Sequence, residues 1–188
     1  MSTKDLVLVA LFTALVAVLS IIPPIPMPFI PVPVTLQTFG VMLTGLILGP
    51  RRSGLVLLLY VLVAMIGIPI LPGGRAGLAV LAGPTGGFLL GMIPGAMLTG
   101  YLAMKSVPPR SGNTQLSVWT LIGLNWMAAL VGGVLIVYLI GIPWLAFVTK
   151  MGLTKASMLM LAFVPIDIAK ALLAAVIAQR LHRYQGMS

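Results

Sequence analysis

The sequence predicts an all-α integral membrane protein, a six-transmembrane-helix bundle with both termini in the cytoplasm and irregular Pro- and Gly-rich outer loops. Of its 188 residues, 60% are hydrophobic and 7% are charged, and the apolar residues form long runs. A soluble domain could not keep such a surface in water, and apolar runs of about 20 residues are typical of membrane-spanning helices. We therefore expect residues 1–188 to form a single transmembrane domain.

Six apolar segments account for the expected helices. They are Leu6–Ile22, Thr35–Gly49, Ser53–Ile68, Thr85–Met104, Leu116–Ile140 and Ala156–Gln179. The second and third are shorter than the ~20 residues that a helix perpendicular to the membrane needs. Their ends are therefore expected to extend into the neighbouring Pro- and Gly-containing loops.

The basic residues orient this bundle. Six spans place both termini on one side, together with the loops after the second and fourth helices. That side carries Lys4, Arg51, Arg52, Lys105, Arg110, Arg180 and Arg183, whereas the other side carries Arg75, Lys150 and Lys155. An excess of Lys and Arg marks the cytoplasmic side, so both termini are expected inside. The net charge of +9 is scattered along the chain, which matches anchoring to an anionic lipid bilayer and argues against nucleic-acid binding.

The outer connections are rich in residues that deform the backbone. The first contains Pro23, Pro24, Pro26, Pro28, Pro31 and Pro33, and the second contains Pro69, Pro72, Gly73, Gly74, Gly83, Pro84, Gly86 and Gly87. Irregular backbone at membrane depth is tolerated only where it is buried in protein or lines a cavity. The outer half of the bundle is therefore the expected ligand side.

Asp167 and Lys170 stand out within the last apolar segment. A charged side chain in hydrocarbon costs roughly 2.5–3.5 kcal/mol on insertion scales, so ionisable residues inside a span indicate a functional site. Pro165 favours a helix break near Val164, which would place Asp167 in the first turn of the restarted helix. The two side chains share a helix face and can pair. A mutual ion pair without a ligand role is the alternative.

Three further residues are candidate ligand contacts. Asn125 lies near the middle of the fifth segment, where a buried amide needs either another helix or a ligand as partner. Trp126, beside it, could form an apolar pocket wall or simply pack. Arg75 is the one charge in the second outer loop; its planar guanidinium suits a carboxylate, although solvation at the membrane rim is equally possible.

Two loop-to-helix junctions add polar or flexible positions. Thr35, Gln37 and Thr38 open the second segment, either as helix caps or as hydrogen-bonding groups that face an outer cavity. Gly86 belongs to the run Gly83-Pro-Thr-Gly-Gly87, whose missing side chains permit close approach of the backbone.

The chain lacks the residues of common catalytic and metal sites. It has no cysteine and no nucleotide-binding P-loop, and its one histidine, His182, lies in the last basic stretch. Its acids are Asp5 and Asp167 alone, so no acidic cluster has metal-ligand spacing. We expect no catalytic residue and no metal. An intramembrane enzyme that acts on lipid through Asp167 remains a minor alternative.

Three ordered motifs resemble one transporter family. The run Pro31-Val-Pro-Val-Thr-Leu-Gln-Thr-Phe-Gly-Val-Met-Leu-Thr-Gly-Leu-Ile-Leu-Gly-Pro-Arg-Arg52, then Gly83-Pro-Thr-Gly-Gly87, then Pro165-Ile-Asp-Ile-Ala-Lys170 are similar to those of the BioY family, the biotin-binding S components of energy-coupling factor transporters. The resemblance covers essentially the whole chain. It implies six helices around one biotin near the outer face of a prokaryotic cell membrane, biotin being the transported ligand, with no cofactor and no catalysis.

The resemblance also implies partners. They are a transmembrane coupling subunit and a pair of cytoplasmic ATPases. Ala10 and Ala14 in the first segment match an Ala-x-x-x-Ala pattern that faces the coupling subunit in related S components. Without the resemblance, this spacing could equally reflect packing inside the bundle.

The chemistry of biotin fits these candidates. Its ureido ring carries two N–H donors and a carbonyl, which suit Asp167, Lys170 and Asn125. Trp126 and the outer-loop residue Phe29 could cover the ring system. Arg75 is the candidate for the carboxylate, with Lys170 as the alternative. An S component for a different vitamin would share the fold and differ in these groups.

Overall fold

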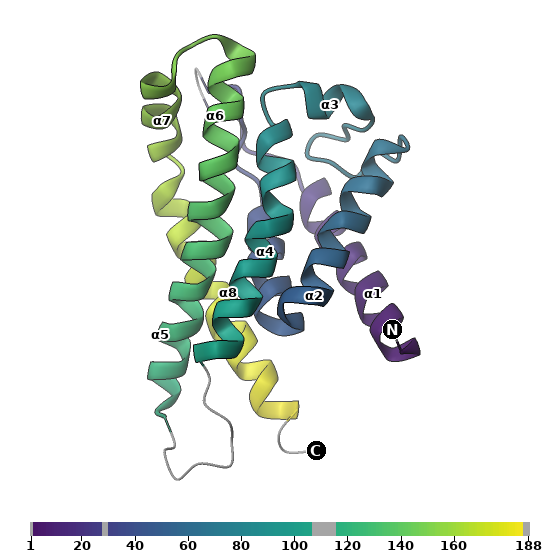
Figure 1. Cartoon of the computed structure of the whole chain (residues 1–188), viewed down its shortest axis with the longest axis vertical. Helices are drawn as coiled ribbons and strands as arrows, with labels where there is room; N and C mark the ends of the chain where they lie inside the picture. The colour runs from purple at the N-terminus through teal and green to yellow at the C-terminus, as the bar shows by residue number, and fades with distance from the viewer. Residues whose placement is uncertain (1, 28–29, 107–115, 186–188) are drawn as a thin grey trace.

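The chain folds into a bundle of helices in the computed structural model, which describes residues 2–27, 30–106 and 116–185 (Figure 1). The helices are α1 (Thr3–Ile21), α2 (Gln37–Met65), α3 (Leu78–Ala82), α4 (Gly86–Ser106), α5 (Val118–Ala129), the π-helix η1 (Leu130–Ile136), α6 (Val137–Thr149), α7 (Leu153–Leu161) and α8 (Val164–Gln185). Within these ranges, extended pairing is limited to the isolated bridges Ile25–Val34 and Leu71–Arg75. The expected all-helical class is confirmed.

Four helices in the described part of the chain are long and apolar enough to cross a membrane. They are α1, α2, α4 and the continuous helix Val118–Thr149, which joins α5, η1 and α6. The pair α7 and α8 passes the same test as one segment bent by 54°. The protein therefore carries several apolar membrane-spanning helices, as its composition predicts.

A sharp reversal divides α2 into two halves. Gly49 has φ 74° and ψ −179°, which is not helical, and Pro50 follows it. In a straight helix, residues 37 and 60 would lie about 34 Å apart, because each residue adds ~1.5 Å. Instead, Gln37 Nε2 lies 3.1 Å from Tyr60 Oη. The two halves therefore run side by side in opposite directions, and they correspond to the second and third expected segments.

Other boundaries differ in part from the expectation. The sequence ends the fifth segment at Ile140, but the helix continues through Pro143 to Thr149. Gly141 packs directly on the Phe88 ring, so the neighbouring α4 supports the helix next to the proline. The short helix α3 is not predicted at all. By contrast, the expected break in the last segment is confirmed, since α8 restarts at Val164 with Asp167 in its first turn.

α4 lies at the centre of the bundle, where glycines let its neighbours approach closely (Figure 1). A Cβ at Gly95 would lie 2.7 Å from the carbonyl oxygen of Gly132 in η1. A Cβ at Gly100 would lie 2.5 Å from the carbonyl carbon of Gly49. Small residues permit such close helix packing in membranes. α4 consequently holds the α2 reversal and the α5–α6 helix in fixed positions.

Both chain ends lie toward the same end of the bundle (Figure 1). Near this end, Arg52 Nη2 lies 2.6 Å from Asp5 Oδ1, an ion pair that joins the start of α1 to the second half of α2. Ser2 and Asp5 also form a reciprocal capping box at the start of α1. The irregular connections that carry α3 lie at the opposite end (Figure 1).

Gly49→Ala is expected to destabilise the protein by about 1–3 kcal/mol, because the backbone conformation of Gly49 is essentially open to glycine alone. A Cβ there would also lie 3.0 Å from Met104 Sδ. Thermal unfolding in detergent measures the change. Gly123→Ala is the matched control, since a Cβ at Gly123 meets no atom within 4 Å, and we expect it to be neutral or slightly stabilising. Equal melting temperatures would contradict this account of Gly49.

Candidate functional site

A cavity lies at the end of the bundle opposite the chain termini. It holds about 650 Å³ of empty space, including its open mouth. Its lining comes from six helices and the connections between them, and comprises Val32, Pro33, Val34, Thr35, Gln37, Thr38, Leu71, Pro72, Arg75, Val80, Thr85, Phe88, Leu89, Met92, Val137, Tyr138, Met160, Phe163, Asp167 and Lys170. Segments far apart in the sequence therefore meet around one space.

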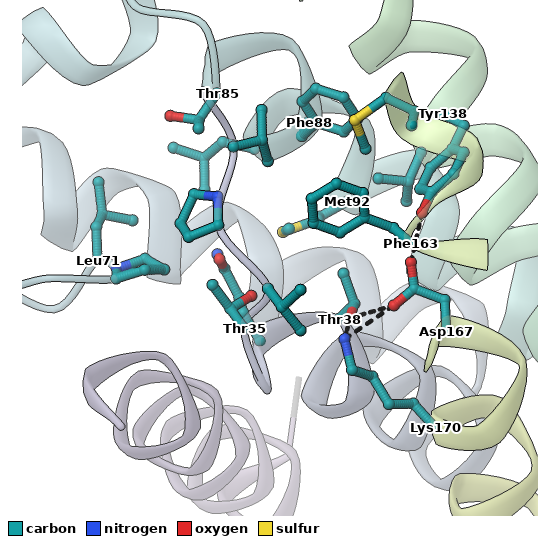
Figure 2. Close-up of a pocket in the computed structure, with 18 of the residues that line it drawn as sticks. Thr35, Thr38, Leu71, Thr85, Phe88, Met92, Tyr138, Phe163, Asp167 and Lys170 are labelled. Atoms are coloured by element: carbon teal, nitrogen blue, oxygen red, sulfur yellow. Dashed lines mark hydrogen bonds and ion pairs between the residues drawn. The ribbon is translucent and has the colours of Figure 1, made fainter. Parts of the chain in front are cut away.

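The charged wall of the cavity belongs to α8. Lys170 Nζ lies 2.9 Å from Asp167 Oδ1, and the two side chains are only 10% and 6% exposed. The break before Val164 places Asp167 in the first helical turn, where the helix dipole favours a negative charge. Lys170 follows three residues later on the same face. The expected pair is formed, and both of its members face the cavity (Figure 2).

Neighbouring helices complete the hydrogen bonding of this pair. Tyr138 Oη of α6 donates to Asp167 Oδ2 at 2.6 Å, and Thr38 Oγ1 of α2 lies 3.2 Å from Asp167 Oδ1. Lys170 Nζ also donates to Thr38 Oγ1 at 3.1 Å. Figure 2 shows these four side chains converging from three helices. Each carboxylate oxygen is thus held, which fixes the direction of its remaining lone pairs.

Beside the charges lies an apolar slot. Phe88 and Met92 of α4 and Phe163 from the α7–α8 break face it (Figure 2). The Phe88 ring meets the Tyr138 ring edge to face, with centroids 6.2 Å apart and an interplanar angle of 87°. This contact orients the tyrosine whose hydroxyl holds Asp167. The slot can accept an apolar ring next to a polar one.

The outer loops form the rest of the wall. Ile25 and Val34 exchange two backbone hydrogen bonds of 2.9 Å, which hold the two ends of the first loop together. The second loop contributes Leu71, Pro72 and Arg75. Arg75 Nε donates to Pro72 O at 3.1 Å, so the side chain is anchored while its exposed guanidinium keeps other donors available. A cation thus stands at the rim of the cavity.

Thr85 contributes an unused polar group. Its Oγ1 is sealed from solvent and has no hydrogen-bond partner, the only such side-chain atom among the described residues. An unpaired buried hydroxyl costs roughly 1–3 kcal/mol. Thr85 lies across the cavity from Asp167 and Lys170 (Figure 2). The site therefore has polar groups at both ends of its apolar slot.

The structure brings together six of the residues singled out from the sequence, all of which line the cavity: Asp167, Lys170, Arg75, Gln37, Thr35 and Thr38. Phe29 lies outside the described residues. Ala10 and Ala14 lie outside this cavity lining, on the exposed face of α1.

Three other candidates lie outside the lining. Asn125 is buried and donates from Nδ2 to Gln179 Oε1 at 3.4 Å, which favours the interhelical alternative. Trp126 Nε1 donates to the backbone oxygen of Ile168 at 3.3 Å, so it contacts α8 on the turn that carries Asp167. Gly86 serves the α3–α4 turn, because a Cβ there would overlap the Leu81 carbonyl.

Sequence reasoning missed the aromatic part of the site. Tyr138, Phe88 and Phe163 line the cavity but were not predicted. Tyr138 could have been predicted as a candidate, since a hydroxyl inside an otherwise apolar segment needs a buried partner. Phe88 and Phe163 could not have been predicted from the sequence, because an aromatic residue in a span is equally suited to packing against lipid.

Comparison with known proteins identifies the family. The model of the BioY family matches residues 1–186. The chain is 46% identical to the biotin transporter BioY of Rhizobium etli over 95% of this chain and 93% of that protein, and 38% identical to the probable biotin transporter BioY of Bacillus subtilis over 98% and 93%. A crystal structure of the S-component for biotin from an ECF-type ABC transporter superposes with a TM-score of 0.86 at 32% identity, covering 97% of this chain and 95% of that one. The chain belongs to the BioY family.

Proposed function

We propose that this chain is the biotin-binding membrane subunit, or S component, of an energy-coupling factor vitamin uptake transporter. The observation that carries the proposal is the buried pair of Asp167 and Lys170 beside an apolar slot, in a chain of the BioY family. Biotin is the cargo and not a cofactor, and residues 1–188 act as one substrate-binding domain in the cell membrane of a prokaryote.

The polar and apolar parts of biotin match the two parts of the cavity. Asp167 accepts a ureido N–H bond with a free lone pair, and Lys170 donates its remaining N–H to the ureido carbonyl. Phe88, Met92 and Phe163 then contact the thiophane ring. Such charge-assisted hydrogen bonds contribute about 1.5–3 kcal/mol each.

Arg75 takes the valerate carboxylate in this proposal. Lys170 already donates to Asp167 and Thr38, which leaves it less free for a second anion. Arg75 stands at the rim with an exposed guanidinium, suited to a carboxylate.

The finer topology is six membrane spans with both termini in the cytoplasm. The reversal at Gly49 supports counting α2 as two spans, and α7 with α8 supports the sixth. Lys4, Arg51, Arg52 and Lys105 lie on segments near the termini, as the positive-inside rule requires for a cytoplasmic face. Arg110 and the side chain of Arg183 lie outside the described part of the chain.

The partners are a transmembrane coupling subunit and two cytoplasmic ATPases. Ala10 and Ala14 support α1 as the docking helix, because both are exposed and small side chains allow a partner helix to approach closely. Biotin enters from outside, the outer loops close over it, and movement driven by the ATPases reorients the bundle so that biotin is released inside.

Asp167→Asn is expected to weaken biotin binding roughly 10- to 150-fold, since the loss of one charge-assisted hydrogen bond costs about 1.5–3 kcal/mol. Lys170→Met is expected to weaken it at least as much, because it also leaves a buried carboxylate without its counter-charge. Calorimetry on detergent-purified protein measures both.

Asp5→Asn and Lys105→Met are the controls for these two variants. Asp5 is the other acid of the chain and pairs with Arg52 near the termini, and Lys105 lies at the end of α4 away from the cavity. Both controls should bind biotin as wild type does. Folded Asp167 and Lys170 variants with unchanged affinity would move the site elsewhere, and wild type that binds another vitamin but no biotin would refute the assigned cargo.

Single cysteines can test the topology, because the chain has none of its own. Ser2→Cys should react with a membrane-impermeant maleimide only in inside-out vesicles. Lys155→Cys, on the exposed start of α7, should react in intact cells. Labelling of both positions from the same side would contradict the six-span arrangement.

Ala14→Trp is expected to abolish co-purification with the coupling subunit while biotin affinity stays within about twofold of wild type, because a bulky side chain blocks close helix packing. Leu139→Trp is the control, since Leu139 is 66% exposed on α6, a different helix. A stable complex with Ala14→Trp would exclude this face of α1 as the docking surface.

A further inference from the structure

Behind the cavity wall, a buried tyrosine connects four segments. Tyr60 of α2 is completely buried, and its Oη lies 3.1 Å from Gln37 Nε2, 2.8 Å from Ser20 Oγ of α1 and 3.2 Å from Ile70 O of the second outer loop. Gln37 lines the cavity and is only 4% exposed. The tyrosine therefore contacts the site through one residue and does not line it.

The number of hydroxyl protons in this network indicates which partner donates in the hydrogen bond between Gln37 and Tyr60. Ser20 Oγ also lies 2.8 Å from Val16 O. Three contacts between oxygens, namely Ser20 with Val16, Tyr60 with Ser20 and Tyr60 with Ile70, compete for the two hydroxyl protons of Ser20 and Tyr60, so one contact is left without a proton. Neither proton is left for Gln37. The network is therefore best satisfied when Gln37 donates from Nε2 and Tyr60 accepts, because Gln37 then adds a proton of its own.

This direction decides which end of the Gln37 amide is available to a ligand. With Nε2 held by Tyr60, the carbonyl Oε1 is the free end. In the described part of the chain, Oε1 has no hydrogen-bond partner. It is not sealed there either, because Thr85 Oγ1 is the one sealed and unpaired side-chain atom among the described residues. Since Gln37 lines the cavity, Oε1 opens onto the space that a ligand would fill.

We propose that Gln37 Oε1 accepts a hydrogen bond from an N–H donor of the ligand, and that Tyr60 is the positioning residue that fixes this orientation. The inference rests on the proposed function and deepens it. A ureido ring has two N–H donors, and Asp167 is already held by Lys170, Thr38 and Tyr138. Gln37 supplies the second acceptor, so the site selects a ligand whose two N–H groups lie on either side of a carbonyl.

The test compares biotin with its two mono-N-methyl derivatives, each of which lacks one ureido N–H. Wild type should bind the derivative without the N–H read by Gln37 at least tenfold more weakly than biotin. Tyr60→Phe should reduce this discrimination about threefold or more, because the amide can then turn its NH₂ toward the ligand. A purely structural role would weaken binding of all ligands by the same factor and leave their ratios unchanged.

Two further variants complete the experiment. Tyr101→Phe is the matched control, since Tyr101 is 45% exposed on α4, and it should preserve every ratio. Gln37→Met keeps the side-chain length and deletes the acceptor, so it should lose the same discrimination even if Tyr60→Phe fails to fold. Unchanged ratios in Gln37→Met would overturn the inference, whereas a wild type without biotin affinity would instead refute the proposed function.

Discussion

Two opposite charges inside an apolar bundle must remain paired, and this requirement organises the outer half of the protein. Asp167 accepts hydrogen bonds from residues of α2, α6 and α8. An unpaired carboxylate at this depth would cost several kcal/mol. The three helices are therefore held together at the level of the cavity, and Phe88 of α4 packs against the Tyr138 ring beside this point.

Glycines at the helix contacts allow the backbones of neighbouring helices to approach closely, and this sets the positions of the helices. The reversal at Gly49 turns α2 back on itself and brings Gln37 beside Tyr60. Close contact between Gly95 and Gly132 sets the α5–α6 helix against α4. Without these contacts, Thr38 and Tyr138 would not reach the same carboxylate. Packing at the centre of the bundle thus determines hydrogen bonding at one end of it.

Much of this arrangement could be predicted from residues whose presence in a membrane segment is costly. Asp167, Lys170 and Pro165 predicted the charge pair and the helix break, because a charge or a proline inside a span is unfavourable unless a partner or a break accommodates it. The α2 reversal was foreseen only as two short segments, since the conformation of Gly49 depends on its tertiary neighbours. The extension of α6 through Pro143 and the inward direction of Phe88 depend on packing between helices, which hydropathy does not encode. Asn125 had two possible partners, and only the geometry favours Gln179 over a ligand.

The neutrality of the Asp167–Lys170 pair bears on the energy of a moving carrier. Moving one elementary charge across the full membrane potential costs or releases about 2.3 kcal/mol per 100 mV. The pair contributes no net charge, so a bundle that tips with an empty site does no electrical work through these two residues. In the proposed complex, the biotin carboxylate would offset the charge of the Arg75 guanidinium, which has no acidic side chain as a partner among the described residues. The electric field would therefore act on an empty carrier through Arg75, but not through the Asp167–Lys170 pair.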